Sequence, residues 1–207
     1  MIAVLALMSA APAISVPDPA TWSVEQKIDY LAAGQARFAG PVSSALYDNP
    51  EVRAEIRRVG FLKGCQLVSQ ARKDVLAVHF STLKAGYTAA IRKTVDENML
   101  KAARFLSFNA SPLTRASFRL RRESERSLAP EFAAIRIELS KRFFEISSPL
   151  PTETDPAANR IKPKADVAGA MGIAGDYDLD NPGYLGLACA EALIDPKYRP
   201  HISGGSE

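Results

Sequence analysis

The chain has 207 residues, of which 47% are hydrophobic and 24% charged, enough for one good-sized hydrophobic core or two small ones. This composition argues against an intrinsically disordered chain, because the apolar side chains can offset the entropy lost on ordering. The net charge of +3 is unevenly spread: residues 49–108 carry 11 basic and 5 acidic side chains, and residues 149–207 carry 5 and 9. The basic middle could meet an anionic partner, or the acidic end could fold onto it.

The N-terminal residues predict a secretory signal peptide at residues 1–13. Residues 2–8 form an apolar run that is too short to span a bilayer, and Ala11-Pro12-Ala13 has the small–x–small form of a signal peptidase site. No Lys or Arg precedes the apolar run. Because signal peptides usually carry a positive charge there, this absence leaves an alternative open, in which the apolar run forms a buried first helix of the fold.

Two helix starts can be recognised before residue 65. Ser23 and Gln26 form a capping-box pattern, and Asn49 followed by Pro50 is a helix cap with proline at the first helical position. Gly60 and Gly64 either break the second helix or allow close packing. The apolar faces of the two predicted helices comprise Val24, Ile28, Leu31 and Phe38 in the first and Val52, Ile56 and Val59 in the second.

The longest periodic region covers residues 66–106 and predicts one long helix, or two helices joined near Val95-Asp96. Ser111-Pro112 predicts the start of the next helix, and Pro130 either starts another helix or kinks this one. Two stripes with steps of three or four residues predict buried faces: Leu76, Phe80, Leu83, Tyr87, Ile91 and Val95, then Phe132, Ile135, Leu139, Phe143 and Ile146.

After Ser148 the prolines at 149, 151, 156 and 163 predict a loop or extended linker. A final short helix over residues 183–194 places Leu185, Cys189 and Leu193 on one face. No alternating strand pattern occurs. The sequence therefore predicts an all-α fold: an irregular helical bundle over residues 14–148, with a Pro-rich connection to a short, docked C-terminal helix within residues 149–207.

The two cysteines, Cys65 and Cys189, lie far apart in the sequence. In an oxidising compartment they would form one disulfide that closes a long loop and ties the C-terminal segment to the helical body. The alternative is two buried free thiols that behave as small hydrophobic side chains. Neither has a CxxC partner, which argues against thioredoxin-like chemistry.

Three alternating aspartates, Asp176, Asp178 and Asp180, raise the question of a calcium site. An EF-hand loop starting at Asp176 would need Gly at its sixth position and Glu at its twelfth, and here these are Asn181 and Leu187. That interpretation fails. A looser oxygen site for calcium remains an alternative to the favoured one, an acidic turn in which Asn181 or Asp180 caps the following helix.

Four arginines, Arg115, Arg119, Arg122 and Arg126, follow helical spacing beside Phe118. Such a stripe is most often a solvated face, with charges balanced by Glu123 and Glu125 or by the acidic tail. The alternative is an anion-binding face for phosphate, lipid headgroups or nucleic acid. No nucleic-acid motif is present, and export argues against that partner.

Nothing in the sequence marks a catalytic residue. His79 lies beside the periodic stripe as a flanking core residue, and His201 lies in the C-terminal tail; neither has a metal-ligand partner nearby in sequence. The motifs GxSxG, HExxH, the P-loop and the Rossmann fingerprint are absent. An enzyme would need a site assembled from distant residues.

Residues 95–116, VDENMLKAARFLSFNASPLTRA, resemble a segment of certain secreted all-helical bacterial proteins of unknown function. In those proteins an acidic helix start leads to an aromatic residue, then to Ser-Pro and a new helix. Here Asp96-Glu97, Phe105 and Ser111-Pro112 stand in that order, with a longer spacing between Phe105 and Ser111. The resemblance implies a secreted helical domain and no activity.

Together these features predict an exported periplasmic or secreted helical protein without a transmembrane segment, and a non-enzymatic binding or interaction module. Its partner would be an anionic surface or another envelope protein, and no cofactor is expected. Two alternatives stay open. One is an enzyme with a site assembled from distant residues, one version of which depends on a metal bound through the Asp176–Asp180 loop. The other is a structural subunit whose apolar faces are completed by another chain.

Overall fold

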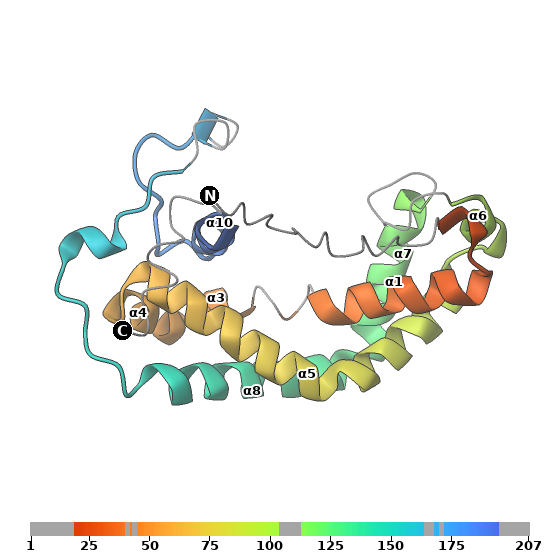
Figure 1. The fold of residues 1–207 in the computed structure, drawn as a ribbon, viewed down its shortest axis with the longest axis horizontal. Helices are drawn as coiled ribbons and strands as arrows, with labels where there is room; N and C mark the ends of the chain where they lie inside the picture. Colours follow the sequence, from red (N-terminus) through yellow and green to blue (C-terminus); the bar gives the residue numbers. More distant parts are fainter. Residues whose placement is uncertain are drawn as a thin grey trace, which may run out of the picture.

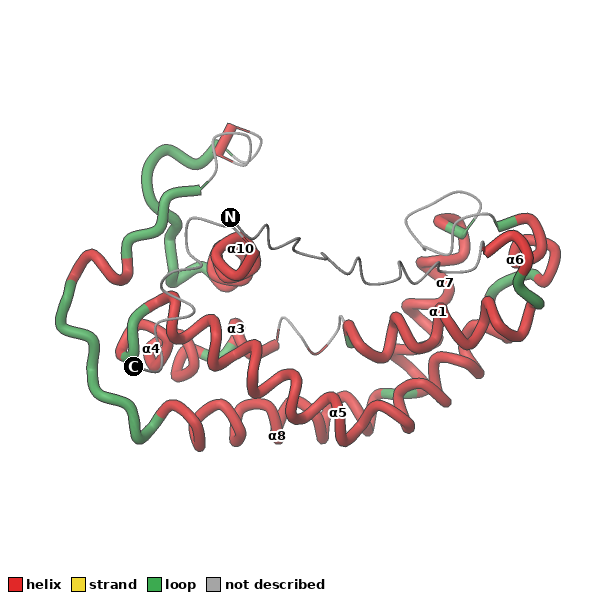
Figure 2. The backbone as a smooth tube through the Cα atoms, viewed as in Figure 1, coloured by secondary structure: helices red, strands yellow, loops and turns green. Residues whose placement is uncertain are grey.

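A computed structural model describes residues 19–39, 42, 45–103, 113–163, 168–169 and 172–194, without the side chains of residues 19, 114 and 115. The predicted signal peptide, Ser111-Pro112 and His201 lie outside these residues. The all-α prediction is confirmed: the described residues form helices and loops, and no strand occurs among them (Figure 2).

The fold is elongated along one central helix, α5 (Phe61–Thr94) (Figure 1). At a rise of about 1.5 Å per residue, its 34 residues span roughly 51 Å. In the described part of the chain, the helices that pack against it are α1 (Val24–Phe38), α4 (Pro50–Arg58), α7 (Thr114–Ser127), α8 (Ala129–Ser147) and α10 (Pro182–Ile194). The shorter helix α3 (Ala45–Asp48) contacts α10, and the shorter helix α6 (Glu97–Ala102) contacts α1. Two 3₁₀ turns are described, Pro19–Thr21 and Pro156–Asn159.

The local start signals act as the sequence predicts. Ser23 Oγ accepts the Gln26 N–H at 3.2 Å while Gln26 Oε1 accepts the Ser23 N–H at 2.8 Å, which completes the capping box of α1. Asn49 Oδ1 accepts the Glu51 N–H at 2.9 Å and starts α4. Asp96 caps α6, so the long periodic region is two helices rather than one.

Proline and glycine positions resolve the remaining alternatives. Pro130 lies in the first turn of α8, so it starts a new helix rather than kinking one. Gly60 lies between α4 and α5 with φ +86°, a backbone conformation that would strain any residue with a side chain. Glycine therefore allows the chain to leave α4 at this point. Gly64 allows close packing: a Cβ there would lie 2.8 Å from the Cα of Ile56 on α4.

A hydrophobic core takes residues from each of the α-helices named above, and the two predicted stripes on α5 and α8 belong to it. Phe38 is the exception to the predicted faces, since its side chain is 71% exposed. It is the last residue of α1, where the chain leaves the helix at Ala39 in the left-handed conformation (φ 37°).

Lys27 is a buried charge that the sequence does not reveal. Its side chain is 2% exposed, and Nζ donates to the carbonyl oxygens of Leu100 at 3.0 Å, Ala103 at 3.1 Å and Lys101 at 3.3 Å. These carbonyls lie at the C-terminal end of α6, where the helix dipole favours a cation. Lys27 therefore joins α1 to α6.

The disulfide between Cys65 and Cys189 is present, with 5.3 Å between the two Cα atoms. Both side chains are fully buried, and the bond joins α5 to α10 across 124 residues of sequence. Closing so long a loop lowers the entropy of the unfolded chain. This stabilises the folded state by at most about 4–5 kcal/mol.

The Pro-rich connection lies along the helical body. The Arg58 guanidinium on α4 donates to the carbonyls of Ser147 at 2.9 Å and Leu150 at 2.8 Å, and the Glu153 N–H donates to the Arg58 carbonyl at 2.6 Å. Glu55 holds that guanidinium through two hydrogen bonds of 2.6 and 2.7 Å. These bonds fasten the end of α8 and the start of the connection to α4.

We expect Gly64→Ala to lower the free energy of unfolding by about 1–3 kcal/mol, because the new methyl group forces α4 away from α5. Gly34→Ala is the matched control. Nothing lies within 4 Å of a Cβ at Gly34, so alanine there should stabilise α1 by about 0.5–1 kcal/mol. Urea unfolding of both variants measures the difference, and equal stability of the two would contradict the close approach of α4 and α5.

Candidate functional site

The predicted arginine stripe lies on α7, at the end of the molecule opposite α10 (Figure 1). Ala116, Leu120 and Ser124 are buried and turn one side of α7 toward the core. The opposite side is exposed and carries Phe118, Arg119, Arg122 and Arg126, which we call the α7 arginine face. Arg115 has the matching helical spacing, but its side chain lies outside the described part of the structure.

The local glutamates neutralise this face only in part. Glu125 binds Arg121 at 2.8 Å, as the four-residue spacing predicts. Glu123 does not pair with Arg119. Its carboxylate lies 2.7 Å from Lys93 Nζ on α5 and 3.8 Å from Arg126.

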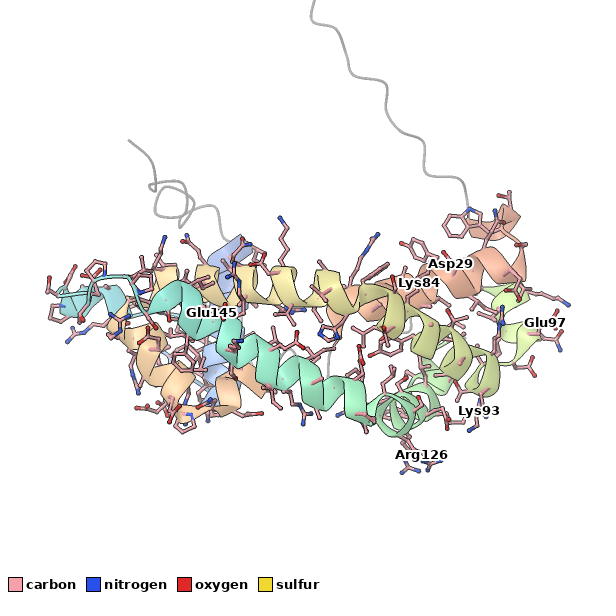
Figure 3. All side chains as sticks on the ribbon, turned by 90° about the horizontal axis from the view of Figure 1, so that it is seen from below. Asp29, Lys84, Lys93, Glu97, Arg126 and Glu145 are labelled. Carbon is pink, nitrogen blue, oxygen red and sulfur yellow. A yellow bond between two sulfur atoms is a disulfide. The ribbon has the colours of Figure 1, made fainter. Side chains whose placement is uncertain are left out.

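Arg119 and Arg122 form no ion pair within 4.0 Å among the described residues. Figure 3 shows Arg126 pointing away from the helical body at the same end as Lys93. The exposed ring of Phe118, at 75%, lies beside these charges on the helix surface. The α7 arginine face therefore presents guanidinium groups and one aromatic ring to solvent.

The described part of the acidic tail does not cover the α7 arginine face. Asp180 pairs with Arg57 on α4, at the far end of the elongated fold. Asn181 Oδ1 accepts the Gly183 N–H at 3.0 Å and so caps α10, which confirms the capped acidic turn. Asp178 Oδ1 accepts the Asp180 N–H at 2.9 Å within that turn.

Asp176, Asp178 and Asp180 do not gather as metal ligands in the structure. Among the described residues, no three His, Cys, Asp or Glu side chains are placed to hold a metal ion. The carboxylates of Asp178 and Asp180 instead serve the backbone turn and Arg57. The alternative of a calcium site therefore has no group of three such side chains in the described structure.

His79 has a role that the sequence does not predict, because both ring nitrogens meet carboxylates on α8. Nδ1 lies 2.7 Å from Glu131 and Nε2 lies 2.9 Å from Glu138, and the side chain is 13% exposed. Burial favours the neutral ring, but the hydrogen bonds and charges of Glu138 and Glu131 together outweigh it and raise the pKa of His79. With both nitrogens occupied, the ring is neither a free base nor a metal ligand.

The His79 contacts predict a pH-dependent stability. Because the pKa of His79 is higher in the folded than in the unfolded state, the folded state binds the proton more tightly. The contribution of this protonated ring to the free energy of unfolding is complete below about pH 6.5. It is lost as pH rises through the folded pKa. Urea unfolding measured from about pH 6 to 8 should show a falling free energy of unfolding, and His79→Gln should flatten that slope. An unchanged slope in the variant would contradict the paired imidazolium.

The chain matches no protein-family model, no curated protein and no solved structure. The resemblance of residues 95–116 to secreted helical proteins stays a prediction, and Phe105 and Ser111-Pro112 lie outside the described residues. Within the described part of the chain, no helix has both the length and the apolar character needed to cross a membrane.

Proposed function

We propose that the chain is an exported, non-enzymatic binding module that docks on an anionic lipid surface through the α7 arginine face. The observation that carries this proposal is the exposed ring of Phe118 beside Arg119 and Arg122, whose charges have no ion-pair partner in the described structure. Unpaired like charges on one helix face repel one another, so an anionic surface that neutralises them gains binding free energy.

The mixture of side chains favours a lipid headgroup layer over other anions. Guanidinium groups donate paired hydrogen bonds to phosphate oxygens, while a phenyl ring buries its apolar surface at the boundary with the acyl chains. On α7 the ring and the arginines point to the same side, opposite the buried Ala116 and Leu120. A helix lying flat on the membrane surface would place both groups at their preferred depth.

Export is supported by two independent features. Residues 1–13 combine an apolar run with an Ala-x-Ala cleavage pattern, and disulfides such as Cys65–Cys189 persist in oxidising compartments. Periplasmic or secreted localisation therefore belongs to the same proposal.

The export proposal predicts the mass of the native protein from its own host. We expect a chain that begins at Ile14 and gains two hydrogens on reduction, because the signal peptide is removed and the single disulfide opens. Intact mass spectrometry with and without reductant measures both. A full-length chain with free thiols would contradict export.

The docking proposal predicts salt-sensitive binding to vesicles that contain phosphatidylglycerol, and little binding to pure phosphatidylcholine. The double variant Arg119→Ala, Arg122→Ala should lose about 2 kcal/mol, roughly 30-fold in the partition constant. Phe118→Ala should lose about 1 kcal/mol, from the apolar contact. Vesicle co-sedimentation over a salt series measures these changes.

The matched control removes the same charge elsewhere. Lys63 and Arg160 are both exposed. Lys63 lies near the start of α5, whereas α7 packs at the other end of that helix, so the control charge at Lys63 is far from the α7 arginine face. Lys63→Ala, Arg160→Ala should bind vesicles as the wild type does. If this control lost as much binding as the α7 variant, the attraction would come from overall charge and not from the α7 arginine face.

A further inference from the structure

A groove runs along α5 between α1 and α10, away from the α7 arginine face. It consists of two adjoining hollows of about 550 and 350 Å³ that share Ser69 and Arg72. The larger hollow follows α5 as far as Phe80 and is bordered by Arg37 of α1. The smaller one continues between α5, Tyr47 of α3 and the exposed side of α10. We call the two together the α5 groove.

The walls of the α5 groove are largely apolar and come from helices α3, α5 and α10. Along α5, from Ser69 to Phe80, the groove is about 16 Å long at the usual helical rise. The apolar residues that line it include Val68, Leu76, Ala77, Phe80, Leu187 and Leu193. A groove of this length and lining suits an aliphatic chain better than a small ion.

The border of the α5 groove is positively charged. Arg37, Arg72 and Lys73 line it, and no carboxylate is among its described lining residues. None of the three forms an ion pair within 4.0 Å in the described part of the chain. Asp74, which follows Lys73, is held by Arg142 of α8 at 2.8 and 2.9 Å.

Arg72 is held in position at the junction of the two hollows. Its Nη2 donates to the Phe38 carbonyl at 2.9 Å, which fixes the guanidinium between α1 and α5. Burial raises the pKa of Tyr47 to about 12, and the nearby charge of Arg72 only partly opposes this. Tyr47 and Arg72 both line the smaller hollow, so a phenol and a held guanidinium border the same space.

We propose that the α5 groove binds a single-chain amphiphile with a carboxylate head, of the long-chain fatty acid class. The carboxylate would be bound by Arg72 with Arg37 and Lys73 nearby, since a guanidinium can donate two parallel hydrogen bonds to it. The aliphatic chain would cover the apolar wall and remove it from water. This site lies on other helices than the α7 arginine face and does not rest on the proposed membrane docking.

The ligand arm of the test is calorimetric titration of the oxidised chain with oleate, below the concentration at which oleate self-associates. We expect one saturable site per chain. Methyl oleate lacks the charge and butyrate lacks the long chain, so each should bind at least about tenfold more weakly. Absence of a saturable oleate site, or butyrate binding as tightly as oleate, would overturn the proposal.

The variant arm separates the groove from the rest of the surface. Arg37→Gln, Lys73→Gln should weaken oleate binding by about fivefold or more, since two charges at the border are lost. Ala77→Phe fills the groove and should weaken binding by at least about tenfold. Val78→Phe is its matched control: Val78 is the next residue, 77% exposed and outside the groove lining, so binding should not change.

Lys63→Gln, Arg160→Gln is the matched control for charge, because it removes two exposed cations and none that lines the groove. Oleate binding should be unchanged in it. An equal loss in this variant or in Val78→Phe would overturn the groove as the site. Circular dichroism melts establish that each variant is folded. If Ala77→Phe unfolds, the variant Arg37→Gln, Lys73→Gln still tests the groove, because both of its residues are exposed and their replacement leaves the core intact.

Discussion

The structure depends on the packing of five helices around α5. Gly64, Ala71 and Ala90 on α5 are buried, and at Gly64 the backbone of α4 approaches so closely that a Cβ would lie 2.8 Å from the Cα of Ile56. The surrounding helices are shorter than α5, and short helices are only marginally stable in isolation, so most of their stability comes from contact with it. The position of each helix along α5 then decides which side chains meet.

That alignment accounts for where the charges of the basic middle are neutralised. Helix α8 runs antiparallel to α5, and this brings Glu131 and Glu138 to His79 and Asp74 to Arg142. Helix α1 is also antiparallel to α5 and is joined to it by Glu25–Arg92 and by Asp29–Lys84, the latter pair labelled in Figure 3. Helix α7 lies at the end of α5, where Glu123 pairs with Lys93 and Glu125 pairs with Arg121, so Arg119 and Arg122 have no ion-pair partner among the described residues.

The two candidate binding regions differ in shape, and the difference bears on their ligands. The α7 arginine face is a single exposed helix surface that can contact an extended anionic layer over several turns. The α5 groove is concave, apolar along its walls and positive at its border, which suits one small amphiphile. The disulfide joins α5 to α10, the helix that forms one wall of the groove, so it holds that wall in place.

The sequence alone determined the caps that start α1 and α4, because a cap is formed by side chains within a few residues of the backbone they bind, and it contains a single possible pair of cysteines. It located a possible break near Val95-Asp96 but left open whether one helix or two form there. It also placed the arginines on one helix face. Only the tertiary structure decided the partners of His79, the unpaired state of Arg119 and the groove at Arg72, since these depend on contacts between residues far apart in the sequence. Such contacts follow from the register of packed helices, and that register is set by the fit of the whole core rather than by any local pattern.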